Sequence, residues 1–162
     1  MKIEYKISGI DGVLDMLKKL PPEVVSKNGG PVKSALRKAA KVIQQQEQAN
    51  LRAIIASNAD DSESTGLLHD NIIVSRGKKP TGSKGERYLV RVKRKVYVRS
   101  NNEGGKTTTW KTARLMEYGD IKQPARPFIR SAAASKAQAA IDTATNELKK
   151  GIDRITRKLA KK

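Results

Sequence analysis

The chain opens on a short alternation of apolar and polar positions. A period of two predicts a half-buried strand over residues 2–7, with one side formed by Ile3, Tyr5 and Ile7. Helical spacing follows over residues 11–20, where the apolar positions are Val13, Leu14, Leu17 and Leu20. Pro21–Pro22 ends this short helix, because proline cannot continue one.

Two longer stretches also have helical spacing. The first runs from Pro31 to Ala56, with an apolar stripe of Val32, Leu36, Ala39, Ile43, Leu51 and Ile54. The polar run 44–48 interrupts the stripe, so we expect a middle that is solvated or faces another subunit. The second runs from Pro127 almost to the end, with a stripe of Ala133, Ala137, Ile141, Ala144, Leu148, Ile152, Ile155 and Leu159. Gly151 is its weak point, since glycine disfavours helix.

The middle of the chain has strand-like patterns. A turn or short helical piece at 65–68 leads into an apolar run at 71–74, and residues 87–99 alternate apolar and charged positions. The alternation breaks at Arg94–Lys95, which predicts a bulge or tight turn. Loops rich in glycine and polar residues separate these runs at 57–64, 77–85 and 100–108, and we expect all three to be mobile.

These elements predict one domain over residues 1–162, with a basic C-terminal end. We expect an α+β fold, in which a small antiparallel β-sheet packs against a long helix of the N-terminal half and a long C-terminal helix.

Residues 111–130 connect the strand-like middle to the last helix. They contain the only Phe (Phe128) and two prolines, Pro124 and Pro127, and the only Trp (Trp110) lies just upstream. Each proline disfavours helix at the residue before it, so we predict a strand, a turn at Gly119, an extended segment and a helix whose first turn contains Pro127. Phe128 is expected to anchor that helix against the sheet.

The composition adds a strong positive charge. The chain has 34 Lys and Arg against 16 Asp and Glu, a net charge of +18, with 37% hydrophobic and 4% aromatic residues. Self-repulsion at this level favours anionic partners or neighbouring subunits. Cysteine is absent, which excludes disulfides and thiolate chemistry. The start resembles no signal peptide and no apolar run is long enough to span a bilayer, so we expect a protein made in the cytoplasm, without membrane partners.

Candidate catalytic and metal-binding groups are weak. His69 could join Ser64 and Asp70, but neighbouring positions do not make a triad, and we interpret it as an exposed histidine beside a turn. Asp60, Asp61 and Glu63 lack the spacing of a calcium loop. Residues 77–85 do not match a phosphate-binding loop. We therefore expect no enzyme activity, catalytic residue, metal or cofactor.

Basic residues concentrate in two regions, where phosphate contacts would give sequence-independent, salt-sensitive binding. The candidate contacts with DNA or an acidic partner are Arg91, Lys93, Arg94 and Lys95 in the strand region and Lys149, Lys150, Arg154, Arg157 and Lys158 in the last helix. Arg87, Arg99, Lys161 and Lys162 extend the two regions. A basic nucleic-acid-binding protein is therefore an alternative, although aromatic residues are few and no nucleic-acid-binding motif is present.

Three segments together resemble the tail-completion family (minor tail-component, neck or head–tail joining proteins) of lambda-like long-tailed phages. They are ISGIDGVLDMLKKLPPEV at the start, STGLLHDNI at 64–72, and ARLMEYG followed by QPARPFIR within 113–130. The last is the most specific, because it is similar to the family's E-[FY]-G and PARPF signature. The sequence departs from the family at Asn71, Thr112 and Ser131.

The resemblance implies a non-enzymatic structural protein that completes the tail or joins tail to head. It implies a homo-oligomeric ring, expected to be hexameric, around the DNA channel in the virion. The implied partners are tail-terminator or tail-tube proteins, head-connector proteins and packaged DNA. The assembly residues that the motifs mark are Thr65, Gly66, Leu68, Glu117, Tyr118, Gly119, Pro124, Arg126, Pro127 and Phe128.

Overall fold

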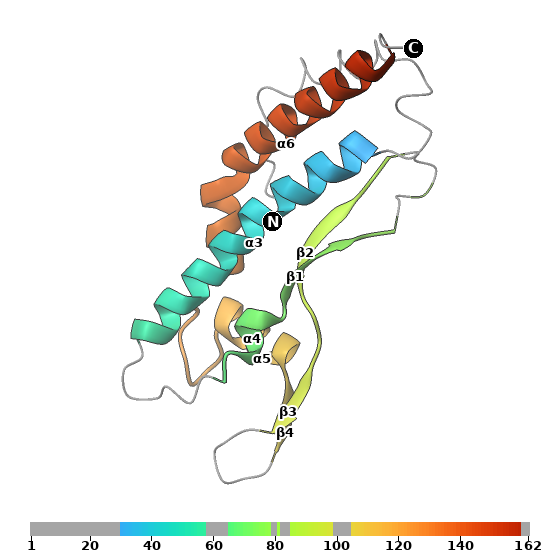
Figure 1. The fold of residues 1–162 in the computed structure, drawn as a ribbon. Helices are drawn as coiled ribbons and strands as arrows, with labels where there is room; N and C mark the ends of the chain where they lie inside the picture. Colours follow the sequence, from blue (N-terminus) through green and yellow to red (C-terminus); the bar gives the residue numbers. More distant parts are fainter. Residues whose placement is uncertain (1–29, 58–64, 79–80, 82–84, 99–104, 160–162) are drawn as a thin grey trace.

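The computed structural model describes residues 30–57, 65–78, 81, 85–98 and 105–159. Its helices are α3 (Gly30–Ser57), α4 (Leu67–Asp70), α5 (Thr109–Tyr118) and α6 (Ile129–Leu159). Its strands are β1 (Ile72–Arg76), β2 (Tyr88–Val92), β3 (Val96–Val98) and β4 (Lys106–Thr108). The predicted α+β class is confirmed (Figure 1). The predicted strand at 2–7 and helix at 11–20 lie outside the described residues.

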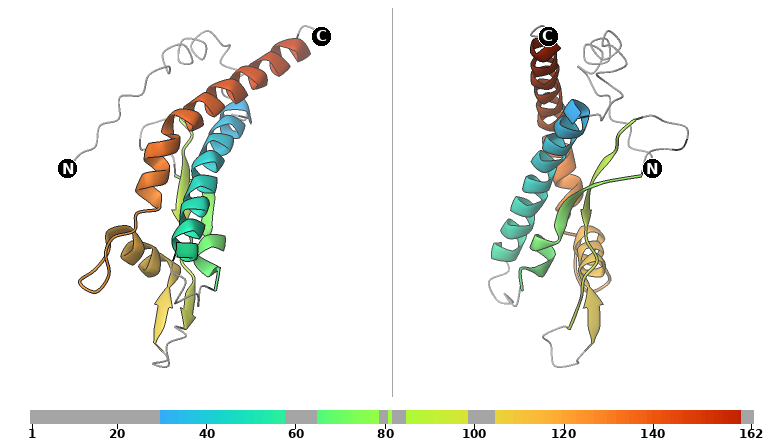
Figure 2. Two further views of the ribbon diagram at one scale, coloured as in Figure 1. Left: turned by 90° about the vertical axis from the view of Figure 1, so that its left-hand side faces the viewer. Right: turned by 45° about the vertical axis from the view of Figure 1, so that its right-hand side comes forward.

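The two long helices α3 and α6 lie side by side over much of their length (Figure 2). Buried Ala35 of α3 meets Leu148 and Ile152 of α6 in an apolar cluster. Gly151 belongs to this contact, because a Cβ there would lie 2.7 Å from the Cβ of Pro31. The glycine that weakens helix propensity thus leaves room for the start of α3 to lie close against α6.

The strands form two antiparallel hairpins rather than the single sheet expected. β1 pairs with β2, with Ile72 opposite Val92, and β3 pairs with β4, with Val96 opposite Thr108. The last three residues of the predicted loop 100–108 form strand β4, and residues 100–104 of that loop lie outside the described part. α3 packs on the β1–β2 hairpin, while β3–β4 extends away at the end opposite the C-terminal end of α6 (Figure 1).

The predicted bulge or tight turn near Arg94 is instead the point where the chain passes from one hairpin to the other. Thr109, fully buried, makes this passage possible. Its hydroxyl donates to the Lys93 carbonyl (2.6 Å) and accepts from the Lys95 amide (2.9 Å). Its own amide donates to the Lys95 carbonyl (3.0 Å). The alternation fails here because these backbone groups bond to the first residue of α5 and not to a neighbouring strand.

The prediction of a strand before Gly119 was wrong, because residues 109–118 are helix α5. The Thr108 hydroxyl accepts from the Lys111 amide (3.2 Å) and caps the helix. Ala113 and Glu117, four residues apart, share its buried face. The charged residue Glu117 hid this helical period, because it lies on the buried face of α5.

The main core lies where α3, β1, α5 and the start of α6 meet. Its buried members are Leu51, Ile72, Ala113 and Phe128. The middle of α3 was predicted to be solvated or to face another subunit, but it is not solvated throughout, because Glu47 there is only 3% exposed. Gln44 nearby donates to the Ile72 carbonyl (2.7 Å). Within the polar run 44–48, Glu47 is therefore buried and Gln44 bonds to β1, while Gln45 remains exposed.

Candidate functional site

The carboxylate of Glu117 caps the N-terminus of α6. Its Oε2 accepts from the amides of Phe128 (3.0 Å) and Ile129 (2.9 Å), and its Oε1 accepts from the amide of Arg130 (3.0 Å). The first amides of a helix lack partners within the helix and carry partial positive charge, so a carboxylate is a strong cap. This cap joins α5 to the start of α6 through residues that lie 11 to 13 positions apart in the sequence.

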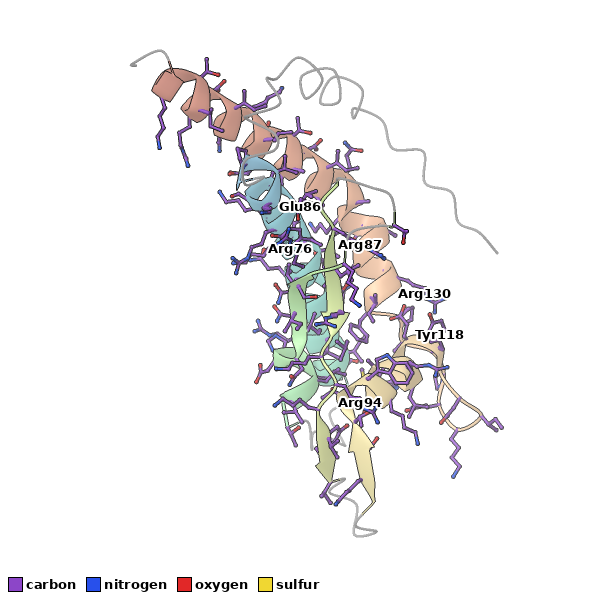
Figure 3. The ribbon with its side chains drawn as sticks, turned by 90° about the vertical axis from the view of Figure 1, so that its right-hand side faces the viewer. Arg76, Glu86, Arg87, Arg94, Tyr118 and Arg130 are labelled. Carbon is purple, nitrogen blue, oxygen red and sulfur yellow. The ribbon has the colours of Figure 1, made fainter. Side chains whose placement is uncertain are left out.

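The Arg130 side chain adds a second connection between α6 and Glu117 of α5. Its Nε donates to Glu117 Oε1 (2.9 Å), and its Nη2 donates to the Glu117 carbonyl (2.7 Å). The guanidinium also lies 5.0 Å from the centre of the Tyr118 ring (Figure 3). Arg130 is half exposed while Glu117 is buried, so the pair joins the interior to the surface.

Gly119 turns the chain between α5 and α6. Its φ of 72° is disfavoured for other residues, and a Cβ would lie 2.7 Å from the Ala125 nitrogen. Its amide donates to the Leu115 carbonyl (2.8 Å). Asp120 then closes the turn, because its Oδ1 accepts from the amides of Lys122 (2.8 Å) and Gln123 (2.9 Å). The predicted turn at Gly119 is confirmed.

The segment Pro124-Ala125-Arg126 folds back on α5. The Arg126 amide donates to the Met116 carbonyl (2.7 Å), while Pro124 and Pro127 are exposed and lie in neither helix nor strand. α6 begins at Ile129, so Pro127 precedes the helix and does not occupy its first turn as predicted. Pro127 instead offers its carbonyl to the Ser131 hydroxyl (2.6 Å).

Phe128 lies in the core as predicted, with no exposed surface. Asn50 of α3 secures this position, because its Nδ2 donates to the Phe128 carbonyl (3.2 Å) and to Ser131 Oγ (3.1 Å). Residues 117–131 therefore form one connected unit, defined by the cap, the turn and these contacts, which we call the cap unit.

The motif at 64–72 forms a separate corner before β1. Gly66 has a φ of 68° and precedes α4. The Leu67 amide donates a long hydrogen bond to Oγ1 of Thr65 (3.4 Å), which is an exposed residue. Leu68 packs on the main core. Asn71 closes the corner through Nδ2, which donates to the Leu67 carbonyl (2.8 Å). The predicted turn or short helix feeding a strand is confirmed.

Glu47 of α3 is a second buried carboxylate, close enough to sense Glu117. Burial first, and the negative charge of Glu117 second, raise the pKa of Glu47 from 4.5 to about 7. No hydrogen bond joins the Glu47 side chain to another described residue. The site thus contains one carboxylate with several donors and another with none.

The predicted basic residues do not form one surface. Arg91, Lys93, Arg94 and Lys95 are exposed along β2 and the passage to β3, near α5 (Figure 3). The other set, on the C-terminal third of α6, lies at the opposite end of the molecule (Figure 1): Lys149, Lys150, Arg154, Arg157 and Lys158. Any DNA or acidic partner therefore meets two separate basic regions.

Two hollows flank Trp110 beside the first basic region. One, of about 590 Å³, lies between β2, α5 and the start of α6 and includes Arg91, Arg114 and Arg130. The other, of about 500 Å³, includes Arg94, Lys106 and Lys111. Arg114 lies over the Trp110 ring, 5.0 Å from its centre.

The catalytic and metal candidates gain no support from the geometry. His69 is half-buried rather than exposed, with Nδ1 3.0 Å from Asp70 Oδ1. Ser64 and the acidic Asp60, Asp61 and Glu63 lie outside the described residues. Within the described ranges, no three His, Asp or Glu side chains gather as a metal site. No helix of the described chain is long and apolar enough to cross a bilayer.

Sequence reasoning missed several residues of the site. Glu47 belongs to the polar run 44–48 that was expected to be solvated or to face another subunit, no role was predicted for Asn50, and Arg130 is only the last residue of the third motif. A charged residue inside an otherwise helical apolar face, as at Glu117, is the one signal that could have indicated a buried cap.

Comparison with protein-family models, curated proteins and solved structures finds no match.

Proposed function

We propose that this chain is a non-enzymatic structural protein of a long-tailed phage, which completes the tail or joins it to the head. The resemblance at 113–130 supports this role. The observation that carries the proposal is that this motif forms the cap unit, in which Glu117, Gly119 and Phe128 cap, turn and anchor the chain. Such residues serve architecture rather than chemistry.

The proposed subunit works as a ring of identical copies, expected to be hexameric, in the neck or at the head-proximal end of the tail. Its proposed partners are tail-terminator or tail-tube proteins and head-connector proteins, with packaged DNA in the channel. Exposed large apolar residues support an assembling subunit: Val96 (63%), Val98 (57%), Trp110 (49%), Tyr118 (64%) and Ile121 (105%). All belong to β3, α5 and the following turn, which form one end of the molecule (Figure 1).

Size-exclusion chromatography with light scattering, followed by pull-down against the neighbouring virion proteins, tests this proposal. We expect a closed oligomer and retention of a neck or tail protein. Immunodetection in purified virions completes the test. A monomer that is absent from virions would overturn the proposal.

The alternative function is sequence-independent nucleic-acid binding, favoured by the net charge of +18. Binding to a DNA duplex, measured across salt concentration, distinguishes it. Counterion release predicts an affinity that falls steeply as salt rises. Absent binding near physiological ionic strength would reject this alternative.

A further inference from the structure

The larger hollow beside Trp110, which we call the arginine groove, combines an apolar interior with a basic rim. Its less exposed members are Val92, Ala113 and Ile129, and its exposed members include Arg91 and Arg114. A groove of about 590 Å³ accommodates a few side chains of a partner. The arginine groove can therefore bury an apolar group of a partner and pair with its negative charge.

The charge of the rim is only partly neutralised within the subunit. Arg130 pairs with Glu117. Arg91 and Arg114 make no ion pair with any other residue in the described part of the chain. Arg94, Lys106 and Lys111 around the adjoining hollow add three further cations in the same condition. This surface therefore attracts an anionic partner.

The composition favours a protein over a nucleic acid as that partner. Arginine and large aromatic side chains are the residues enriched where proteins bind each other most strongly. Phosphate contacts require no apolar interior. The nearby outer face of β3–β4 also exposes Val96 and Val98, which a phosphate backbone would leave uncovered.

We infer that the arginine groove binds an acidic segment of a partner protein. One apolar side chain of the segment packs against Val92, Ala113 and Ile129, and flanking carboxylates pair with Arg91 and Arg114. Arginine suits this task because its planar donors match a carboxylate. The inference deepens the proposed function, on which it rests for the identity of the partner, by assigning the surface where a virion protein docks.

Fluorescein-labelled synthetic peptides test the inference with the full-length protein. The first peptide alternates Glu and Asp with Leu and Phe, and the second keeps every charge but replaces Leu and Phe by Ser. Labelled single-stranded and duplex DNA are the other probes. Anisotropy gives the affinities, and emission of the sole tryptophan, Trp110, reports binding at the arginine groove or the adjoining hollow, which the arginine variants then distinguish.

We expect the first peptide to bind saturably, to change Trp110 emission, and to bind at least about tenfold more tightly than the second. Arg91→Ala and Arg114→Ala should each weaken it about tenfold, and Arg114→Lys less. Lys149→Ala and Lys150→Ala remove the same charge at the distant end of α6 and should have little effect. Circular dichroism confirms that each variant is folded.

Equal affinity for both peptides, or equal loss in the α6 variants, would show unspecific charge attraction and overturn the inference. Tighter binding of DNA, weakened by the same two arginine variants, would replace the protein partner by a nucleic acid. Self-association that Arg114→Ala abolishes, without peptide binding, would identify a second copy as the occupant instead. Groove binding in a protein absent from virions would refute the proposed function alone.

Discussion

Glu47 of α3 and Glu117 of α5 are both buried, and the charge of Glu117 helps to raise the pKa of Glu47 to about 7. Glu117 has amide and guanidinium donors around its carboxylate, whereas the Glu47 side chain has no hydrogen bond to any other described residue. The two carboxylates therefore have opposite consequences for stability.

Glu47 should make the protein less stable as pH rises. Its folded-state pKa lies above its unfolded value of 4.5, so its favourable contribution is present below pH 4.5 and is lost as pH rises through about 7. Glu47→Gln should therefore stabilise at pH 8 by up to about 3 kcal/mol and much less near pH 5. Urea unfolding at the two pH values measures the difference.

Glu147 provides a control of opposite sign for this experiment. Its ion pair with Lys38 lowers its pKa, so Glu147→Gln should not stabilise at pH 8. An equal gain from Glu47→Gln at both pH values would show that Glu47 is not protonated in the folded state at low pH.

Removing the cap at Glu117 should be strongly destabilising. Glu117→Gln leaves one acceptor oxygen for three amides and places an NH₂ group against donors, for an expected loss of about 2–4 kcal/mol. Thermal or urea unfolding measures it. Asp142→Asn removes the same charge from an exposed position of α6 and should change stability by less than about 0.5 kcal/mol. Equal effects of both substitutions would contradict the role of the cap.

Gly119 should not tolerate a side chain. Gly119→Ala introduces strain at φ 72° and a contact of 2.7 Å with the Ala125 backbone nitrogen, for a loss of about 3 kcal/mol. Gly105→Ala is the matched control, because no atom lies within 4 Å of its Cβ position. Unfolding of both variants gives the comparison, and a neutral Gly119→Ala would mean that the turn is not held in this conformation.

Phe128→Ala should destabilise the protein by about 3–5 kcal/mol, since it empties a fully buried position in the cluster that contains Leu51 and Ile72. Ile121→Ala, at a fully exposed position, should leave stability within about 0.5 kcal/mol. Under the proposed function, Phe128→Ala should also impair tail joining in a phage complementation assay. If folding and tail joining both remained intact, our account of residues 111–130 would be wrong.

Local patterns were sufficient for much of the fold. The apolar stripes of α3 and α6, the strand periods of β1 and β2, and the glycine turn at 119 depend on near neighbours in the chain, and these predictions were right. The break near Arg94 was also visible, because the alternation of side chains stops there.

Contacts between distant segments determined the rest. α5 was mistaken for a strand because Glu117 interrupts its apolar face, and that carboxylate is buried only because the amides of residues 128–130 satisfy it. Thr109, Asn50 and Gly151 likewise have partners more than 10 positions away in the chain. A buried polar group is stable only with its partner, and no period along the chain reveals which distant residue that partner is.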